Sequence, residues 1–189
     1  MGVDMLAWGK NRGLVPIVAV LLVAEVIAVL TVGTQFQIPS LLGLQGLEVP
    51  IGFFLPLVAI VGFGVSMERQ PYTLERRSRR PVRVWDGVFA GVLVGLIALP
   101  AAWDSAATWL GAACSTATGI GIVMMLRRAP AGTRALVPSG WIFFGVLTGR
   151  SYGHDAWWNW PVAAWPSPVA LNWAAGAMAA GFIVHLSDR

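Results

Sequence analysis

Long apolar runs with almost no charge constrain the fold of this chain more than any other feature. A helix that spans a membrane needs about 20 mostly apolar residues, because each residue advances it by about 1.5 Å. Six stretches meet this description, at 14–32, 50–67, 87–103, 105–126, 136–149 and 168–186. The second has an alternative, earlier start through Leu41–Leu47. We therefore predict an all-α, polytopic integral membrane protein whose six transmembrane helices form one domain, 1–189.

The composition supports the same class of protein. Hydrophobic residues make up 57% of the chain and charged residues 12%, against roughly 25% charged in a typical soluble domain. One soluble core of this size cannot bury that much apolar surface, so most of it is expected to face lipid or other helices. The net charge of +4 is concentrated at the ends of the apolar runs, which disfavours nucleic acid as a partner. Scarce Lys beside abundant Ala, Gly, Val and Arg is typical of GC-rich bacterial genomes, which indicates the bacterial cytoplasmic (inner) membrane.

The basic residues predict which side of the membrane each loop faces. With six spans and both termini inside, 12 of the 13 Lys and Arg residues lie on the cytoplasmic side, six of them in the loop between the second and third helices, 68–86. Arg150 alone lies outside. Cytoplasmic loops carry an excess of Lys and Arg, so both termini and residues 68–86 are expected in the cytoplasm and residues 150–167 outside.

A stretch rich in Trp and Pro, 157–168, separates the fifth and sixth predicted helices. It contains four tryptophans and three prolines. Pro interrupts a helix, and the stretch is too apolar to lie free in water. We expect short interfacial helices or a re-entrant segment at the outer surface, covered by protein or by a watery cavity.

Glu25 is the most informative single polar residue. It lies near the middle of the first predicted helix, where a charged side chain costs about 2.5–3.5 kcal/mol. It is expected to face the bundle. Two interpretations remain open: a group on a substrate path or proton relay, or a structural carboxyl hydrogen-bonded to a hydroxyl such as that of Ser115 or Thr118.

Small residues at four-residue spacing allow helices to approach closely in lipid. Two such sets occur, Gly87, Gly91 and Gly95 on the third predicted helix and Ala175, Gly176, Ala179 and Ala180 on the sixth. They are expected to pack within the monomer or to form a dimer seam.

No combination of residue types points to an enzyme. His154 and His185 are predicted on opposite sides of the membrane, and Cys114, the single cysteine, lies inside an apolar run. Neither a metal-ligand set nor a disulfide is expected. The chain has no glycine-rich phosphate loop. We therefore predict no catalytic residue, no metal, no cofactor and no enzymatic activity.

The basic loop 68–86 has three interpretations. The first is an anchor that fixes the topology. The second is a site for anionic lipid head groups, in which each basic residue near the surface contributes about 1 kcal/mol of binding free energy. The third is a docking segment for a partner protein. For the third interpretation, residues 73–77 can form a short helix that Pro81 ends before the third span.

The run ERQPYTLERRSRRPV resembles the cytoplasmic segment of export-type ABC transporter permeases, the type-2 export family. In that family an acidic-basic pair closes the second helix, a Thr-Leu-Glu-like step starts a coupling helix, and a Pro leads into the third span. The family's topology is also similar, with six helices, both ends inside, and short re-entrant helices outside between the fifth and sixth. Pro71-Tyr72 departs from the Gly-rich sequence more usual there, and the chain is shorter than typical members. The matching positions are Glu68, Arg69, Thr73, Leu74, Glu75 and Pro81.

The resemblance implies a permease subunit of an ATP-driven exporter. A separate cytoplasmic ATPase would bind the ATP, and two permeases, identical or different, would form the transporter within the membrane lipids. The residues implied in coupling to the ATPase are Glu68, Arg69, Thr73, Leu74 and Glu75. Two alternatives remain: a substrate-binding membrane subunit of a vitamin-uptake transporter, which needs a ligand pocket on the outer side, and a stand-alone membrane enzyme or immunity protein.

Overall fold

The computed structural model describes residues 8–38, 47–69, 82–102, 106–130, 132–148, 158–162 and 167–187. These residues are mostly helical, as the sequence predicts. The long helices are α2 (Leu14–Leu30), α3 (Leu55–Glu68), α5 (Val82–Ala98), α6 (Ala106–Met125), α7 (Thr133–Thr148) and α8 (Pro168–Ser187). A helical turn, 8–12, precedes α2.

Among the described residues, four helical segments are long and apolar enough to cross a membrane. They are Ile51–Glu68, Arg83–Ala102, Ala107–Met125 and Pro168–Ser187, and the first two include the 3-10 turns η1 (Ile51–Phe54) and η2 (Leu99–Ala102). Helix α2 is apolar but has 17 residues, and α7 has 16 with Pro138 inside it. The coarse prediction of a bundle of apolar helices is therefore confirmed for the described residues.

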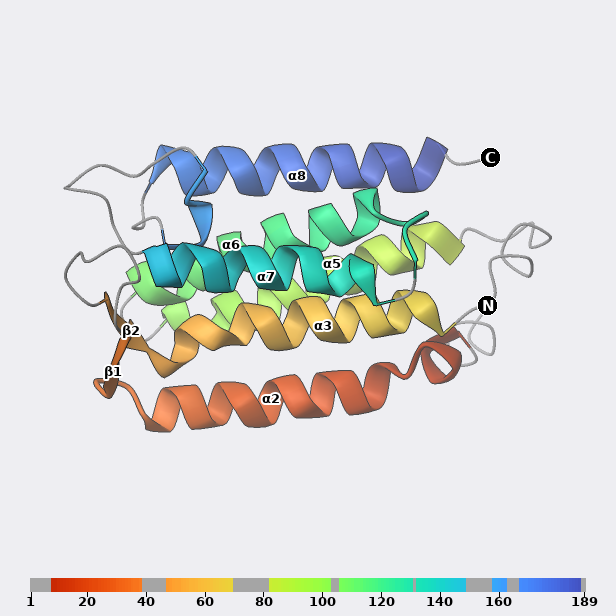
Figure 1. The fold of residues 1–189 in the computed structure, drawn as a ribbon. Coiled ribbons are helices and arrows are strands. Elements are labelled where there is room, and N and C mark those ends of the chain that lie inside the picture. Colours follow the sequence, from red (N-terminus) through yellow and green to blue (C-terminus); the bar gives the residue numbers. More distant parts are fainter. Residues whose placement is uncertain are drawn as a thin grey trace.

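The helices lie side by side and run alternately in opposite directions, so that the turn 8–12 and the last residues of α8 lie at the same end (Figure 1). We call this the basic end; it contains the turn 8–12, the last residues of α3, α6 and α8, and the first residues of α5 and α7. Helix α6 packs against α3, α5, α7 and α8, whereas α2 packs mainly on α3. Helix α2 is thus the peripheral member of the bundle.

A small antiparallel sheet lies at the opposite end, which we call the hairpin end (Figure 1). Strand β1 (Gln35–Ile38) pairs with β2 (Leu47–Pro50), with Gln35 opposite Pro50. Leu47 begins a strand, so the earlier helix start through Leu41–Leu47 is wrong at Leu47; residues 41–46 lie outside the described residues. Pro56 lies in the first turn of α3, where proline's missing N–H costs no hydrogen bond.

The closest helix contact joins α6 and α8. A Cβ atom added to Gly121 would collide with the backbone of Ala177, and one added to Gly181 would lie 2.5 Å from the Gly121 carbonyl oxygen. Small residues therefore do bring two helices together, but at positions that the sequence analysis did not select.

The predicted small-residue sets mostly face outward. On α5, only Gly87 packs within the chain, against the ring of Phe182, while an added Cβ would meet nothing within 4 Å at Gly91 or Gly95. Ala175, Gly176 and Ala179 on α8 are exposed. Packing within the monomer therefore holds at Gly87 and is wrong at the exposed positions, while the alternative of a dimer seam stays a prediction. Helices that are apolar all round give no sequence signal for their inner face.

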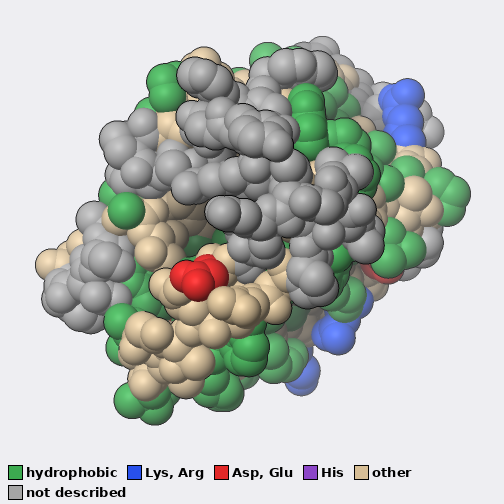
Figure 2. Space-filling view, turned by 60° about the vertical axis from the view of Figure 1, so that its left-hand side comes forward, with side chains coloured by type: hydrophobic (Ala, Val, Ile, Leu, Met, Phe, Trp, Pro, Cys, Tyr) green, Lys and Arg blue, Asp and Glu red, His purple; other side chains and the backbone are tan. Residues whose placement is uncertain are grey.

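Large apolar side chains cover the outside of the bundle. Val15, Leu30, Leu136 and Ile183 are 78%, 80%, 71% and 67% exposed. Figure 2 shows hydrophobic side chains over much of the described surface in that view. Contiguous exposed apolar surface of this kind indicates contact with a membrane or with other apolar elements.

Candidate functional site

The described Lys and Arg residues all lie at one end of the molecule. They are Lys10, Arg12, Arg69, Arg83, Arg127, Arg128 and Arg134, and each belongs to the basic end or to the turns that border it. At the hairpin end the described charged residue is Glu48. In Figure 2, which turns the hairpin end forward, the Lys and Arg side chains lie toward the right-hand side of the view. The folded chain is thus electrically asymmetric along the helix axes.

A buried charge cluster, formed by Arg12, Asp86 and His185, lies inside the basic end. Arg12 donates from Nη2 to Oδ2 of Asp86 at 3.1 Å, and Nε2 of His185 lies 3.2 Å from the same oxygen. Arg12 also donates from Nη1 to the carbonyl oxygen of Ser66 at 2.9 Å. The side chains are 0%, 2% and 0% exposed, respectively. The cluster therefore connects the turn 8–12 to α3, α5 and α8.

Local structure explains why these side chains meet. Gly13 ends the turn 8–12 with a φ of 66°, a conformation that glycine adopts without strain, and this bend separates the turn from α2. Asp86 lies near the N-terminus of α5 and His185 in the last turn of α8. The dipole of α8 favours a basic side chain in its last turn, whereas Asp86 lies beyond the first turn of α5 and meets its partners by packing.

Two further arginines hold the end of α8. Arg127, which is 4% exposed, donates from Nη1 to the His185 carbonyl oxygen at 3.2 Å. Arg83 donates to the Leu186 carbonyl oxygen at 3.1 Å. The last carbonyls of a helix lack partners within it, so the arginines of α5 and of the turn after α6 supply the missing donors.

The cluster neutralises one buried carboxylate with one buried guanidinium and an imidazole. A His185 tautomer with the hydrogen on Nε2 donates to Asp86, which leaves Nδ1 buried without a hydrogen-bond partner among the described residues. A buried, unpartnered ring nitrogen is costly. The arrangement holds together segments that are far apart in the sequence.

Of the residues predicted to couple to an ATPase, the structure describes Glu68 and Arg69. Oε1 of Glu68 accepts a hydrogen bond from the Gly132 N–H at 2.5 Å, which ties the end of α3 to the turn before α7. Arg69 is exposed, and its guanidinium lies against Gly13, where an added Cβ would collide with it. Thr73, Leu74 and Glu75 lie outside the described residues, so their role stays a prediction.

Glu25 is buried, at 6% exposure, on the face of α2 directed toward the bundle. Its Oε1 atom has no hydrogen-bond partner in the described part of the chain. The hydroxyl of Ser115 donates to the Pro161 carbonyl at 3.5 Å and that of Thr118 to the Cys114 carbonyl at 2.9 Å. Neither hydroxyl therefore supplies the hydrogen bond that the structural interpretation of Glu25 required.

A pocket of about 320 Å³ opens at the hairpin end. It lies where the end of α2 meets β1, η1 and α6. Its lining mixes apolar and polar groups: Ala28, Thr31, Gln35, Gly52, Thr108 and Trp109, with neighbouring residues.

Parts of the predicted Trp- and Pro-rich stretch are also described. Residues 160–162 form the 3-10 turn η3 (Trp160–Val162), which contacts α6, α7 and α8. Trp160 is buried at 3% exposure. The expected segment between the fifth and sixth helices is thus partly helical and packed on the bundle at 160–162; residues 163–166 lie outside the described residues.

The cluster of Arg12, Asp86 and His185 was not predicted from the sequence. Arg12 entered only the count of cytoplasmic basic residues, residue 86 served only as the bound of the basic loop, and His185 was placed only by its side of the membrane. Within the described residues, no three His, Cys, Asp or Glu side chains gather closely enough to hold a metal ion.

The chain was compared with family models, curated proteins and solved structures. No family model matches the chain, and no curated protein or solved structure compared with it is significantly similar.

Proposed function

We propose that the chain is a multi-pass protein of the bacterial cytoplasmic membrane that crosses the bilayer six times with its basic end in the cytoplasm. The observation that carries the proposal is the segregation of every described Lys and Arg at one end of a bundle with an apolar exterior. This is the charge pattern of a membrane protein oriented by its cytoplasmic loops. Helices α2 and α7 are about 24–26 Å long at 1.5 Å per residue, which a slightly thinned bilayer accommodates.

The proposal extends to a transport role, as the permease subunit of an ATP-driven, ABC-type exporter. Its support is the resemblance of residues 68–86 to a coupling segment, together with the contacts at both ends of that segment. The α3 end is bonded through Glu68 to the turn before α7, and the α5 start is bonded through Asp86 to the turn 8–12 and α8. A partner that pulls on the segment would therefore move several helices together.

In this mechanism the chain performs no covalent chemistry. The ATP is bound and hydrolysed by a separate cytoplasmic subunit, and the six helices supply half of the membrane pathway. A homo- or heterodimer of permeases completes the transporter. Leu74 is the apolar anchor of the coupling segment, because burying one aliphatic side chain contributes about 1.5–3 kcal/mol.

Co-purification from native membranes tests the proposal. The tagged chain should bring down a protein with ATPase activity, and Leu74→Asp should remove that activity from the eluate while leaving insertion and expression unchanged. The matched control is the Arg79→Gln, Arg80→Gln double variant, which weakens attraction to anionic lipid but keeps the anchor. Equal ATPase recovery with Leu74→Asp would reduce the loop to a topology anchor.

The pocket at the hairpin end favours a second candidate, the substrate-binding membrane subunit of an uptake system. In the proposed orientation this pocket of about 320 Å³ faces the outside, and it is just large enough for a small ligand. An uptake subunit should tolerate replacement of residues 70–81 by an unrelated basic linker, whereas an exporter permease should lose function. The same loop exchange thus discriminates between the two candidates.

A further inference from the structure

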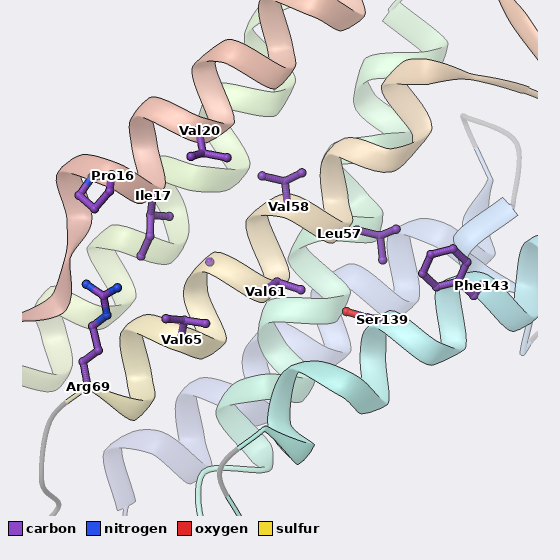
Figure 3. A pocket seen from close by; sticks show the side chains of 11 residues that line it. Pro16, Ile17, Val20, Leu57, Val58, Val61, Val65, Arg69, Ser139 and Phe143 are labelled. Atoms are coloured by element: carbon purple, nitrogen blue, oxygen red, sulfur yellow. The ribbon is translucent and has the colours of Figure 1, made fainter.

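A groove of about 610 Å³ runs along the side of the bundle and shares no lining residue with the buried charge cluster or with the pocket at the hairpin end. Its floor is α3 and its walls are α2 and α7 (Figure 3). The lining residues are Pro16, Ile17 and Val20 of α2, Leu57, Val58, Val61, Gly62 and Val65 of α3, and Ser139 and Phe143 of α7, with Arg69 after the end of α3.

Small and branched side chains on α3 keep the groove open. Gly62 allows α2 to lie close to the floor, because a Cβ at that position would approach Cγ2 of Ile17 to 2.7 Å. Val61 and Val65 are 44% and 37% exposed, so the floor is accessible from the side of the bundle. In the proposed orientation this opening faces the lipid.

The groove has one charged end. Arg69 is its charged lining residue and lies at the basic end, beside Pro16 and Ile17 (Figure 3). The rest of the lining is almost entirely apolar. From Leu57 to Arg69 the helix advances about 18 Å at 1.5 Å per residue, which is close to half of a bilayer core of about 30 Å.

We propose that this groove binds one anionic phospholipid of the cytoplasmic leaflet, with an acyl chain along α3 and the phosphate on Arg69. The apolar length matches one leaflet, and a guanidinium binds phosphate through two parallel hydrogen bonds. A zwitterionic lipid fills the apolar part equally well but carries no net negative charge to Arg69. The inference rests on the proposed membrane location and is independent of the transport role.

Native mass spectrometry of the full-length protein tests this proposal. The protein, purified in a non-ionic detergent, is titrated with phosphatidylglycerol or phosphatidylcholine that carry the same acyl chains. The wild type should retain one phosphatidylglycerol more tightly than phosphatidylcholine. Arg69→Gln should weaken phosphatidylglycerol binding about fivefold, the effect of one basic residue at a charged surface, and Lys10→Gln, the same change at an exposed residue outside the groove, should not.

A second pair of variants tests the apolar part. Val61→Trp fills the floor and should remove the tightly retained lipid of both kinds. Val92→Trp places the same bulk on α5 at a position with 46% exposure, outside the groove, and should retain lipid as the wild type does. Val61→Phe serves in place of Val61→Trp if gel filtration shows that the tryptophan variant misfolds.

Three outcomes would overturn the proposal: Arg69→Gln binding phosphatidylglycerol like Lys10→Gln, Val61→Trp retaining lipid like Val92→Trp, or the wild type binding inorganic phosphate, in a manner that Arg69→Gln loses, while retaining no phosphatidylglycerol. The last result would make Arg69 an anion site without a lipid groove. Resistance of the protein to alkaline extraction from membranes is measured in parallel. Extraction would refute the membrane location itself, whereas resistance with no retained lipid would refute only the groove.

Discussion

Removal of the Asp86 carboxylate should destabilise the fold more than any other single change at a charged residue described here. In Asp86→Ala, Arg12 and His185 both lose the oxygen that they share, at 3.1 and 3.2 Å. Arg12 stays buried, and its hydrogen bond to the Ser66 carbonyl does not replace the negative charge that the variant removes. Breaking a buried ion pair by removing one partner costs about 3–5 kcal/mol, and we expect a loss in this range.

Asp86→Asn provides a graded version of the same perturbation. The amide oxygen still accepts one hydrogen bond, but the charge that balances Arg12 is gone. A hydrogen bond to a charged group contributes about 1.5–3 kcal/mol, so the loss should fall below that of Asp86→Ala. In the Arg12→Met, Asp86→Leu double variant neither charge is left unpaired, and we expect much of the loss in Asp86→Ala to be recovered.

The assay is reversible unfolding in mixed micelles, in which increasing dodecyl sulfate unfolds the purified protein and tryptophan fluorescence reports the transition. Glu48→Ala is the control, because Glu48 is exposed on β2 and surface substitutions usually change the free energy of unfolding by less than about 0.5 kcal/mol. A loss of less than about 1 kcal/mol in Asp86→Ala would refute the view that the cluster joins the segments. The free energy of unfolding is also measured for Arg12→Met and Asp86→Leu alone. If the double variant loses as much as these two single variants added together, the charge argument is refuted.

Single cysteines placed at positions 78 and 151 of a Cys114→Ala background should react with a membrane-impermeant reagent from opposite sides, and labelling of both from the same side would refute the six-span topology. Gly121→Ala should lower the free energy of unfolding by about 1–3 kcal/mol, because the added Cβ collides with the α8 backbone. Gly91→Ala is the control, because its added Cβ meets nothing within 4 Å, and it should be neutral or slightly stabilising. Equal effects of the two variants in the unfolding assay would contradict the assigned α6–α8 contact.

The helical class of the fold was predictable because it follows from the length of apolar runs. The start of α5 was not. The sequence analysis began that helix at residue 87, after the charges of the loop, whereas α5 begins at Val82. Arg83 and Asp86 enter the helix because each finds partners on α8. Partners about 100 residues away along the chain cannot be deduced from local composition.

The hairpin and the helix faces were missed for related reasons. Strands β1 and β2 are four residues each, too short for an alternating pattern to stand out beside long apolar runs. The inner face of a helix is normally predicted as the face opposite its polar residues. Here α6 and α8 are apolar nearly all round, so nothing in the sequence distinguished Gly121 and Gly181 from Gly91 and Gly176.

The buried charge cluster also has a consequence for biosynthesis. Arg12 is made first, Asp86 74 residues later and His185 a further 99 residues later. Until α8 has entered the bundle, Asp86 lacks one of its two partners and the α6 surface around Gly121 is uncovered. Completion of the basic end therefore depends on α8, which is made after the other described helices. A chain that stops before α8 would therefore carry a half-paired carboxylate and an uncovered α6 surface, two features that distinguish it from the finished protein.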